Sequence, residues 1–240
     1  MQLALKALDL PRISAAFKVH STIPIASGLG SGAALATALI RAVGEFTNRP
    51  FEPEILNALV YEVEKKHHGT PSGIDNTVIV YEKPVYFQRL SPTEAQIETF
   101  HIGQPFTLLV ADTGQASPTR LAVGDVRRLH EFDPSRTERI FARIGEIVRA
   151  ARQAIESGAF EALGPLMDEN HALLRNLTVS SDSLERLCQT ARDAGARGAK
   201  LSGGGRGGNL IALVAPDRAD PVRDALRTAG AANVIQTTVG

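Results

Sequence analysis

The pattern of apolar and polar positions predicts a mixture of strands and helices in the first half of the chain. Apolar residues alternate with polar ones over residues 13–19, which predicts a strand that runs into a glycine-rich segment. At residues 28–32 the period changes, and the apolar positions that follow recur at helical spacing, which predicts a helix over about residues 30–47. Pro53 favours the start of a second helix, because proline is tolerated in a first helical turn.

The second half opens after a polar segment, residues 91–104, where we place a domain boundary between a unit over residues 1–100 and one over 104–240. The run FTLLVA at residues 106–111 has the length of a buried strand. Three helical patterns follow; the first ends at Gly158 and the third is capped by Ser181 or Asp182. The predicted elements after them are strands near 198–202 and 209–214, a helix near 217–229 and a strand near 233–238.

Composition and charge narrow the class of protein. The chain has 240 residues, of which 43% are hydrophobic and 22% charged, as in ordinary globular proteins. Its 26 basic and 26 acidic residues balance, so we expect neither a nucleic acid nor a membrane as partner. The single cysteine, Cys188, lies on an apolar helical stripe and is interpreted as a core residue. The N-terminal segment does not resemble a signal peptide, and we expect a cytoplasmic protein.

The first segment with candidate chemistry is PIASGLGSGAA at residues 24–34, between a predicted strand and a predicted helix. Glycine allows positive φ and lets successive backbone N–H groups point at one spot. Such a nest at a helix N-terminus favours a phosphate group. The alternative is a tight strand-to-helix turn packed on a helix of small residues.

The second segment, residues 64–76, places two carboxylates around a Pro/Ser/Gly turn. Glu64 follows Val60 by four residues and so shares the apolar stripe of its helix. It is therefore either exposed at the helix end or directed inward with a cation to meet. Asp75 fits either a chemical role or a helix cap. His67 and His68 are adjacent and so diverge by about 100° on a helix, which argues against a zinc site.

The third segment, KLSGGGRGGN at residues 200–209, has five glycines in six positions between two predicted strands. Glycine costs conformational entropy, so close approach to a ligand or to another backbone would justify this number. Arg206 offers a planar positive fork that suits phosphate. The alternative is a flexible exposed loop.

Four segments, in the correct order, resemble motifs of the GHMP small-molecule kinase superfamily, and most closely those of its mevalonate kinase branch. PIASGLGSGAA is similar to the ATP-binding P-x-x-x-G-L-G-S-S-A-A, and HGTPSGIDN is similar to H-G-x-P-S-G-x-D-N. VADTGQASPTR resembles the D-T-G segment that opens the second domain, and KLSGGGRGGNLIAL resembles K-L-T-G-A-G-G-G-G. The resemblance covers about residues 12–240. It implies an α+β fold of two domains: a ribosomal-S5-domain-2-like N-terminal half, truncated at its start, and a ferredoxin-like C-terminal half with added helices.

The resemblance also implies a function: an ATP- and Mg²⁺-dependent phosphorylation of the primary hydroxyl of mevalonate, a step of isoprenoid biosynthesis. Asp75 would accept the proton of that hydroxyl or orient it, and Glu64 and Ser31 would hold Mg²⁺. A homodimer is common in the family. The residues implied to bind ATP are Pro24, Ser27, Gly28, Leu29, Gly30, Ser31, Gly32 and Ala33. Those implied beside the substrate are His68, Gly69 and Ser72, and those of the second glycine loop, near the active site, are Ser202, Gly203, Gly204 and Gly205.

The chain departs from the family pattern at two places. Gly32 stands where many members have a second serine that reaches Mg²⁺, so water or Ser31 would replace that ligand. Nothing resembles the first family motif, P-G-K-x-x-L-x-G-E-H, which carries an active-site lysine; its loss would remove a charge that stabilises the transition state. Two alternatives stay open: a superfamily kinase for a sugar or homoserine, and a catalytically impaired ATP-binding fragment.

Overall fold

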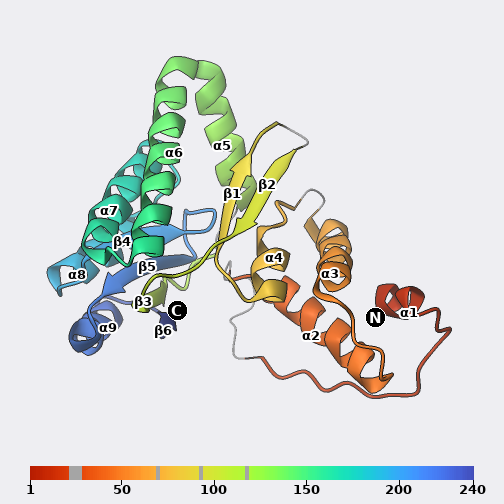
Figure 1. Cartoon of the computed structure of the whole chain (residues 1–240). Coiled ribbons are helices and arrows are strands. Elements are labelled where there is room, and N and C mark those ends of the chain that lie inside the picture. The colour runs from red at the N-terminus through yellow and green to blue at the C-terminus, as the bar shows by residue number, and fades with distance from the viewer. Residues whose placement is uncertain (22–28, 69–70, 92–93, 117–118) are drawn as a thin grey trace. The chain divides into compact units, whose positions relative to one another are not determined.

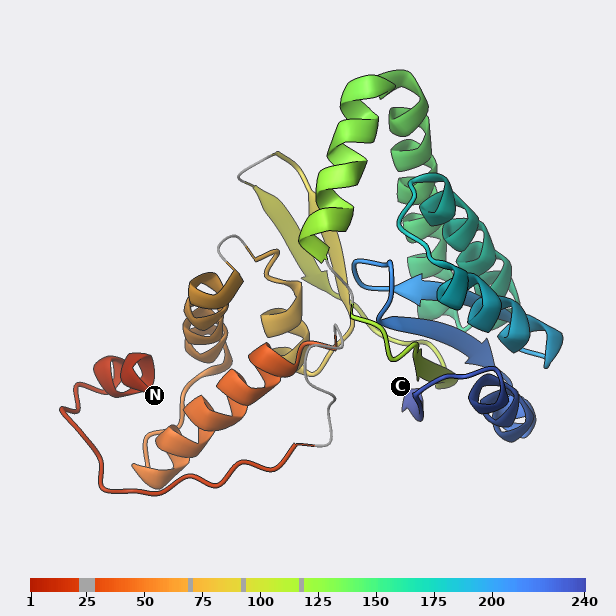
Figure 2. The ribbon, with the colours of Figure 1, turned by 180° about the vertical axis from the view of Figure 1, so that it is seen from behind.

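The described residues fall into two compact units, one within residues 1–101 and one within residues 102–240 (Figure 1, Figure 2). Each unit has its own sheet and its own buried apolar core, which is the basic requirement for a separately folding body. The structure is a computed structural model that describes residues 1–21, 29–68, 71–91, 94–116 and 119–240.

The first unit combines helices with a two-stranded sheet. Strands β1 and β2 pair antiparallel, with Phe87 opposite Ile97. Helices α2, α3 and α4 contribute to one core, in which Ala33 of α2 and Val60 of α3 are fully buried. A side chain as small as Ala33 lets α2 lie close to its neighbours. The described elements are α1 (Gln2–Ala7), α2 (Ser31–Phe46), α3 (Pro53–His68), α4 (Ile74–Tyr81), β1 (Val85–Arg89) and β2 (Ala95–Thr99).

The helices predicted near residue 30 and from Pro53 are confirmed, but the strand predicted from the alternation over residues 13–19 is wrong. Residues 11–21 have no regular secondary structure. In the described part of this unit β1 and β2 pair only with each other, so the alternating segment has no partner strand. Ile13 and Phe17 instead pack against the helical core. The sequence pattern does not predict strand β2, because the strand lies in the polar segment assigned to the domain boundary.

The second unit is built around a four-stranded sheet in the order β4-β5-β3-β6, in which all neighbours are antiparallel. Its elements are β3 (Phe106–Asp112), α5 (Thr119–Phe132), α6 (Pro134–Ser157), α7 (Phe160–Asn176), α8 (Asp182–Asp193), β4 (Gly198–Ser202), β5 (Asn209–Val214), the 3₁₀ turn η1 (Pro216–Arg218), α9 (Ala219–Thr228) and β6 (Asn233–Val239).

Alternate residues of these strands pack on two different layers of helices. Leu109 and Leu210 are fully buried in one core with residues of α8 and α9. Leu108 and Ile211, one position along each strand, pack instead with Leu163 of α7 and residues of α6. The sheet is therefore covered on both faces, which explains the continuous apolar runs of β3 and β5.

The strands and helices predicted for this unit are confirmed. Ser181 caps α8, because its Oγ accepts a hydrogen bond from the Leu184 N–H at 3.4 Å. Gly158 ends α6 with φ 72°, in the left-handed region that favours glycine. Cys188 is fully buried in the core, as predicted. No helix in the described ranges is long and apolar enough to cross a bilayer.

Candidate active site

The start of α2 lies beside the start of α4. Gly30 caps α2 with φ 67°, and the Ala34 N–H donates to the Gly30 carbonyl at 2.9 Å. A β-carbon placed on Gly30 would lie 3.3 Å from Ile79 Cδ1 and 3.7 Å from Asp75 Cβ and Cγ. Gly30, the residue before α2, therefore lies directly against Asp75. Asp75 is an exposed residue in the first turn of α4.

Glu64 lies at the other side of the same helix start. It is directed inward from α3, with an exposed fraction of 5%, which confirms the inward alternative given by its position four residues after Val60. A β-carbon placed on Gly32 would lie 3.2 Å from Glu64 Oε1. The structure thus brings a buried carboxylate to the first turn of α2.

Two carboxylates from two helices therefore converge on one helix N-terminus in the first unit. The partial positive charge and free N–H groups of a helix N-terminus suit phosphate oxygens. Mg²⁺ is bound in proteins by one or two carboxylates together with substrate phosphates and water, so Glu64 fits as a ligand. In the described ranges no group of three or more His, Cys, Asp or Glu residues gathers in a metal-binding arrangement.

Several predicted site residues fall outside this geometry. Pro24, Ser27, Gly28 and Gly69 lie outside the described residues, as does the side chain of His68. Ser31 and Leu29 are half-buried at the start of α2, whereas Ala33 is fully buried in the core. Ala33 packs in the core, where its small side chain lets α2 lie close to its neighbours, and its predicted role toward ATP stays a prediction.

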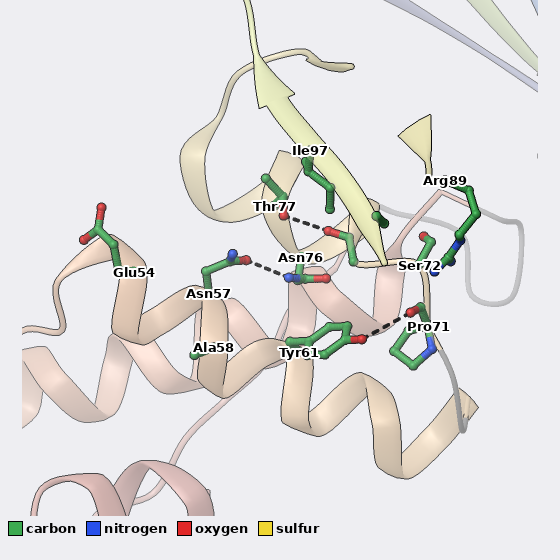
Figure 3. Close-up of a pocket in the computed structure, with 12 residues that line it drawn as sticks. Glu54, Asn57, Ala58, Tyr61, Pro71, Ser72, Asn76, Thr77, Arg89 and Ile97 are labelled. Atoms are coloured by element: carbon green, nitrogen blue, oxygen red, sulfur yellow. Dashed lines mark hydrogen bonds between the residues drawn. The ribbon is translucent and has the colours of Figure 1, made fainter. Parts of the chain in front are cut away.

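Ser72 makes a local hydrogen bond just before α4, whose N-cap is Gly73. The Ser72 Oγ accepts a hydrogen bond from the Ile74 N–H at 3.3 Å. The Ser72 side chain also lines a cavity of about 380 Å³ that lies along α3, α4 and the two strands (Figure 3). Asp75, Glu64 and Gly30 are not among the residues that line it. This cavity is therefore on another side of α4 from the two carboxylates.

The cavity walls fix the position of α4, and no motif of the sequence points to them. Tyr61 Oη donates to the Pro71 carbonyl at 3.4 Å, and Asn76 Nδ2 donates to Asn57 Oδ1 at 2.7 Å (Figure 3). Asn57 and Tyr61 are four residues apart on α3 and so share one face of it. That spacing is the only sequence signal of their joint role.

The glycine loop of the second unit divides into packed and open positions. A β-carbon on Gly205 would lie 1.9 Å from the Val179 carbonyl oxygen, and one on Gly207 would lie 2.7 Å from that of Ala116. Gly203 has φ 84° and nothing within 4 Å of such a β-carbon. The alternative of close backbone approach is thus correct for Gly205 and Gly207, whereas Gly203 borders open space.

Arg206 is engaged within this unit. Its guanidinium forms an ion pair with Asp125 of α5, and Nε donates to the Thr178 carbonyl at 3.3 Å. Its backbone N–H donates to the Val179 carbonyl at 2.8 Å, and its φ is 60°. Arg206 therefore holds the loop against α5 and the turn before α8, and its suitability for phosphate stays a prediction.

Comparison with known proteins identifies the family. Residues 2–83 match the family described as GHMP kinases N terminal domain. Residues 151–232 match the family described as GHMP kinases C terminal. The mevalonate kinase of Pyrococcus furiosus is 35% identical over 246 residues, which cover 98% of this chain and 70% of the relative. This chain belongs to the mevalonate kinase family of the GHMP kinases. The predicted superfamily and its α+β two-domain fold are confirmed.

Other members of the mevalonate kinase family are similar to the same extent. The mevalonate kinase of Thermococcus sibiricus is 36% identical over 222 residues, which cover 90% of this chain and 65% of that protein. The structure of L. major mevalonate kinase in complex with R-mevalonate matches with a TM-score of 0.87 and 32% identity, over 99% of this chain and 74% of that one. The chain thus spans about two thirds of the length of such relatives.

Proposed function

We propose that this protein transfers the γ-phosphoryl group of ATP to the primary hydroxyl of mevalonate. The observation that carries the proposal is the convergence of an exposed carboxylate, Asp75, and a buried one, Glu64, on the first turn of α2. Membership of the mevalonate kinase family supports the substrate, and a related structure holds R-mevalonate.

In the proposed reaction the mevalonate oxygen forms a bond to the γ-phosphorus, and the bond from that phosphorus to the β-phosphate oxygen breaks. Asp75 accepts the hydroxyl proton or orients the hydroxyl toward phosphorus. The N–H groups at the start of α2 hold the phosphates, because glycine at position 30 leaves the backbone accessible. Glu64 and Ser31 hold Mg²⁺, which neutralises charge on the phosphates when bound.

The remaining predicted contacts belong to the same proposal. His68, Gly69 and Ser72 are assigned to the substrate pocket by the family motif. Ser202, Gly203, Gly204 and Gly205 of the second glycine loop are assigned to the neighbourhood of the active site by the family motif. Phosphoryl transfer depends on positioning and charge stabilisation, so residues that make no bond to the reacting atoms still contribute to the rate.

The test is ADP release by the full chain with ATP and Mg²⁺, with mevalonate, galactose or homoserine as acceptor. We expect turnover with mevalonate that exceeds turnover with the other two alcohols by at least about tenfold. Asp75→Asn should lower the turnover at least about 100-fold, because the acceptor of the proton is lost. Its affinity for ATP should stay within about twofold, and Asp217→Asn, an exposed aspartate of the second unit, serves as the matched control.

Each other result changes the conclusion. Turnover with galactose or homoserine alone would identify a kinase for a different alcohol. ATP binding without turnover on any of the three acceptors would identify a catalytically impaired ATP-binding protein. Full activity of Asp75→Asn would remove Asp75 from the mechanism.

A further inference from the structure

A second cavity lies in the second unit. Its volume is about 160 Å³, and it is bounded by α6, α7 and strand β4. Most of its wall is apolar, and the only polar side chains that line it are those of Asn170 and Lys200. Its main lining residues are Ile147, Ala151, Leu163, Met167, Asn170 and Lys200.

The register of the sheet explains why Lys200 enters this cavity. Ala199 and Leu201 are buried in the core with α8 and α9, so the residue between them points to the opposite face. Lys200 is paired with Ile211, which packs on the α7 side of the sheet. A lysine is thus placed on the face of the sheet that α6 and α7 cover.

The Lys200 ammonium has no counterion in the described part of the chain. Nζ donates to the Leu201 carbonyl at 2.8 Å, and no carboxylate of those residues lies within ion-pair distance. The Asn170 amide, on a residue with an exposed fraction of 9%, likewise has no hydrogen-bond partner among them. Burial lowers the pKa of Lys200 from 10.5 to about 8. A buried charge without a partner is costly, and a bound anion would remove that cost.

We propose that this cavity binds a small aliphatic carboxylate. The carboxylate would pair with the Lys200 ammonium and accept a hydrogen bond from Asn170, and its aliphatic chain would lie against α6 and α7. A monoanion matches the single ammonium, so that the pair is neutral when buried. The volume leaves room for a ligand of roughly five to ten non-hydrogen atoms. This inference does not depend on the proposed kinase function.

The chain offers a direct probe, because Met1 and Met167 are its only methionines. The full chain labelled with ¹³C at the methionine methyl groups would be titrated with hexanoate, and then with hexanol and hexylammonium of the same chain length. We expect hexanoate to shift the Met167 methyl resonance and leave that of Met1 unchanged. Hexanol should bind at least tenfold more weakly, and hexylammonium should produce no shift.

The variant Lys200→Leu tests whether binding depends on the charge of the ammonium or on the shape of the cavity. Lys200→Leu should weaken hexanoate binding at least tenfold and leave hexanol binding within twofold, while Lys6→Leu, an exposed lysine of the first unit, should change neither. Equal affinity for hexanol and hexanoate in the unmodified chain would overturn the proposal, as would the absence of any Met167 shift. These two titration results come from the unmodified chain, so they test the proposal even if Lys200→Leu fails to fold.

Discussion

Gly32 in the first turn of α2 faces the carboxylate of Glu64 on α3, so closely that a β-carbon at position 32 would lie 3.2 Å from Oε1. Position 32 is where the family motif has a second serine. The glycine therefore lets the first turn of α2 approach the buried carboxylate that is proposed to hold the metal ion.

Gly32→Ser should tighten Mg²⁺ binding. The new hydroxyl would stand beside Glu64 and supply a second oxygen ligand, and Glu64 needs to move only by a few tenths of an ångström to admit the β-carbon. We expect the Mg²⁺ concentration for half-maximal ADP release to fall by roughly threefold to tenfold. The measurement is a Mg²⁺ titration at saturating ATP and mevalonate.

Gly32→Ala is the matched control for this prediction, because it adds the β-carbon without the hydroxyl. It should leave the Mg²⁺ requirement unchanged or raise it slightly. If alanine and serine at position 32 act alike, the effect comes from packing against Glu64 and the hydroxyl is no ligand.

The sequence predicts the elements around this site better than it predicts their contacts. The inward position of Glu64 follows from its spacing to Val60, and the start of α2 follows from the change of period at residues 28–32. The segment 13–19 alternates like a strand, but alternation cannot supply a partner strand, and none exists among the described residues.

The glycine loop of the second unit also shows that local sequence does not predict tertiary contacts. Gly203 and Gly205 look equivalent in the sequence, yet only Gly205 lies against the Val179 carbonyl. That contact depends on the turn before α8, which is distant in sequence. The same holds for Lys200, whose cavity is formed by α6 and α7. Local pattern identifies such segments, and tertiary packing decides what each residue does.

Gly205→Ala should destabilise the second unit far more than Gly203→Ala. The added methyl group would meet the Val179 carbonyl oxygen at 1.9 Å, whereas at Gly203 it would meet nothing within 4 Å. Both positions have positive φ, so Gly203→Ala should cost only about 1–2 kcal/mol. Gly205→Ala should cost more than about 3 kcal/mol. Urea unfolding of the two variants gives the difference, and equal losses would mean that the loop relaxes away from Val179.

Removing Asp125 should cost more stability than removing Arg206. Arg206→Gly loses a half-buried ion pair and the hydrogen bond to the Thr178 carbonyl, but it relieves the left-handed backbone at φ 60°, a gain of about 1 kcal/mol that offsets much of this loss. Asp125→Ala leaves the guanidinium of Arg206 without its carboxylate and also removes the ion pair with Arg128, while the strained backbone remains. In thermal unfolding, the melting temperature of Arg206→Gly should therefore lie close to that of the unmodified chain, and that of Asp125→Ala should lie below it. The reverse order would show that the ion pair is not what holds the loop.

Lys200 should make the stability of the free protein depend on pH in a defined direction. Its pKa is about 8 in the folded chain and 10.5 is its usual value, so between these pH values the unfolded chain binds more protons than the folded one. The free energy of unfolding should therefore rise as pH increases from 8 to 10.5. Below pH 8 it is lowered by the full cost of burying the Lys200 ammonium. Lys200→Leu, which has no titrating group at this position, should be the more stable protein at pH 7, by up to about 3 kcal/mol.

The difference between the two proteins is the informative quantity, because other groups titrate in the same range and cancel in it. Urea unfolding at pH 7, 8, 9 and 10 should show the advantage of Lys200→Leu shrinking with each step above pH 8. A constant difference would mean that the Lys200 ammonium is solvated in the folded chain and keeps its usual pKa. Hexanoate should also reduce the advantage at pH 7, since a bound carboxylate stabilises only the protein that keeps the lysine.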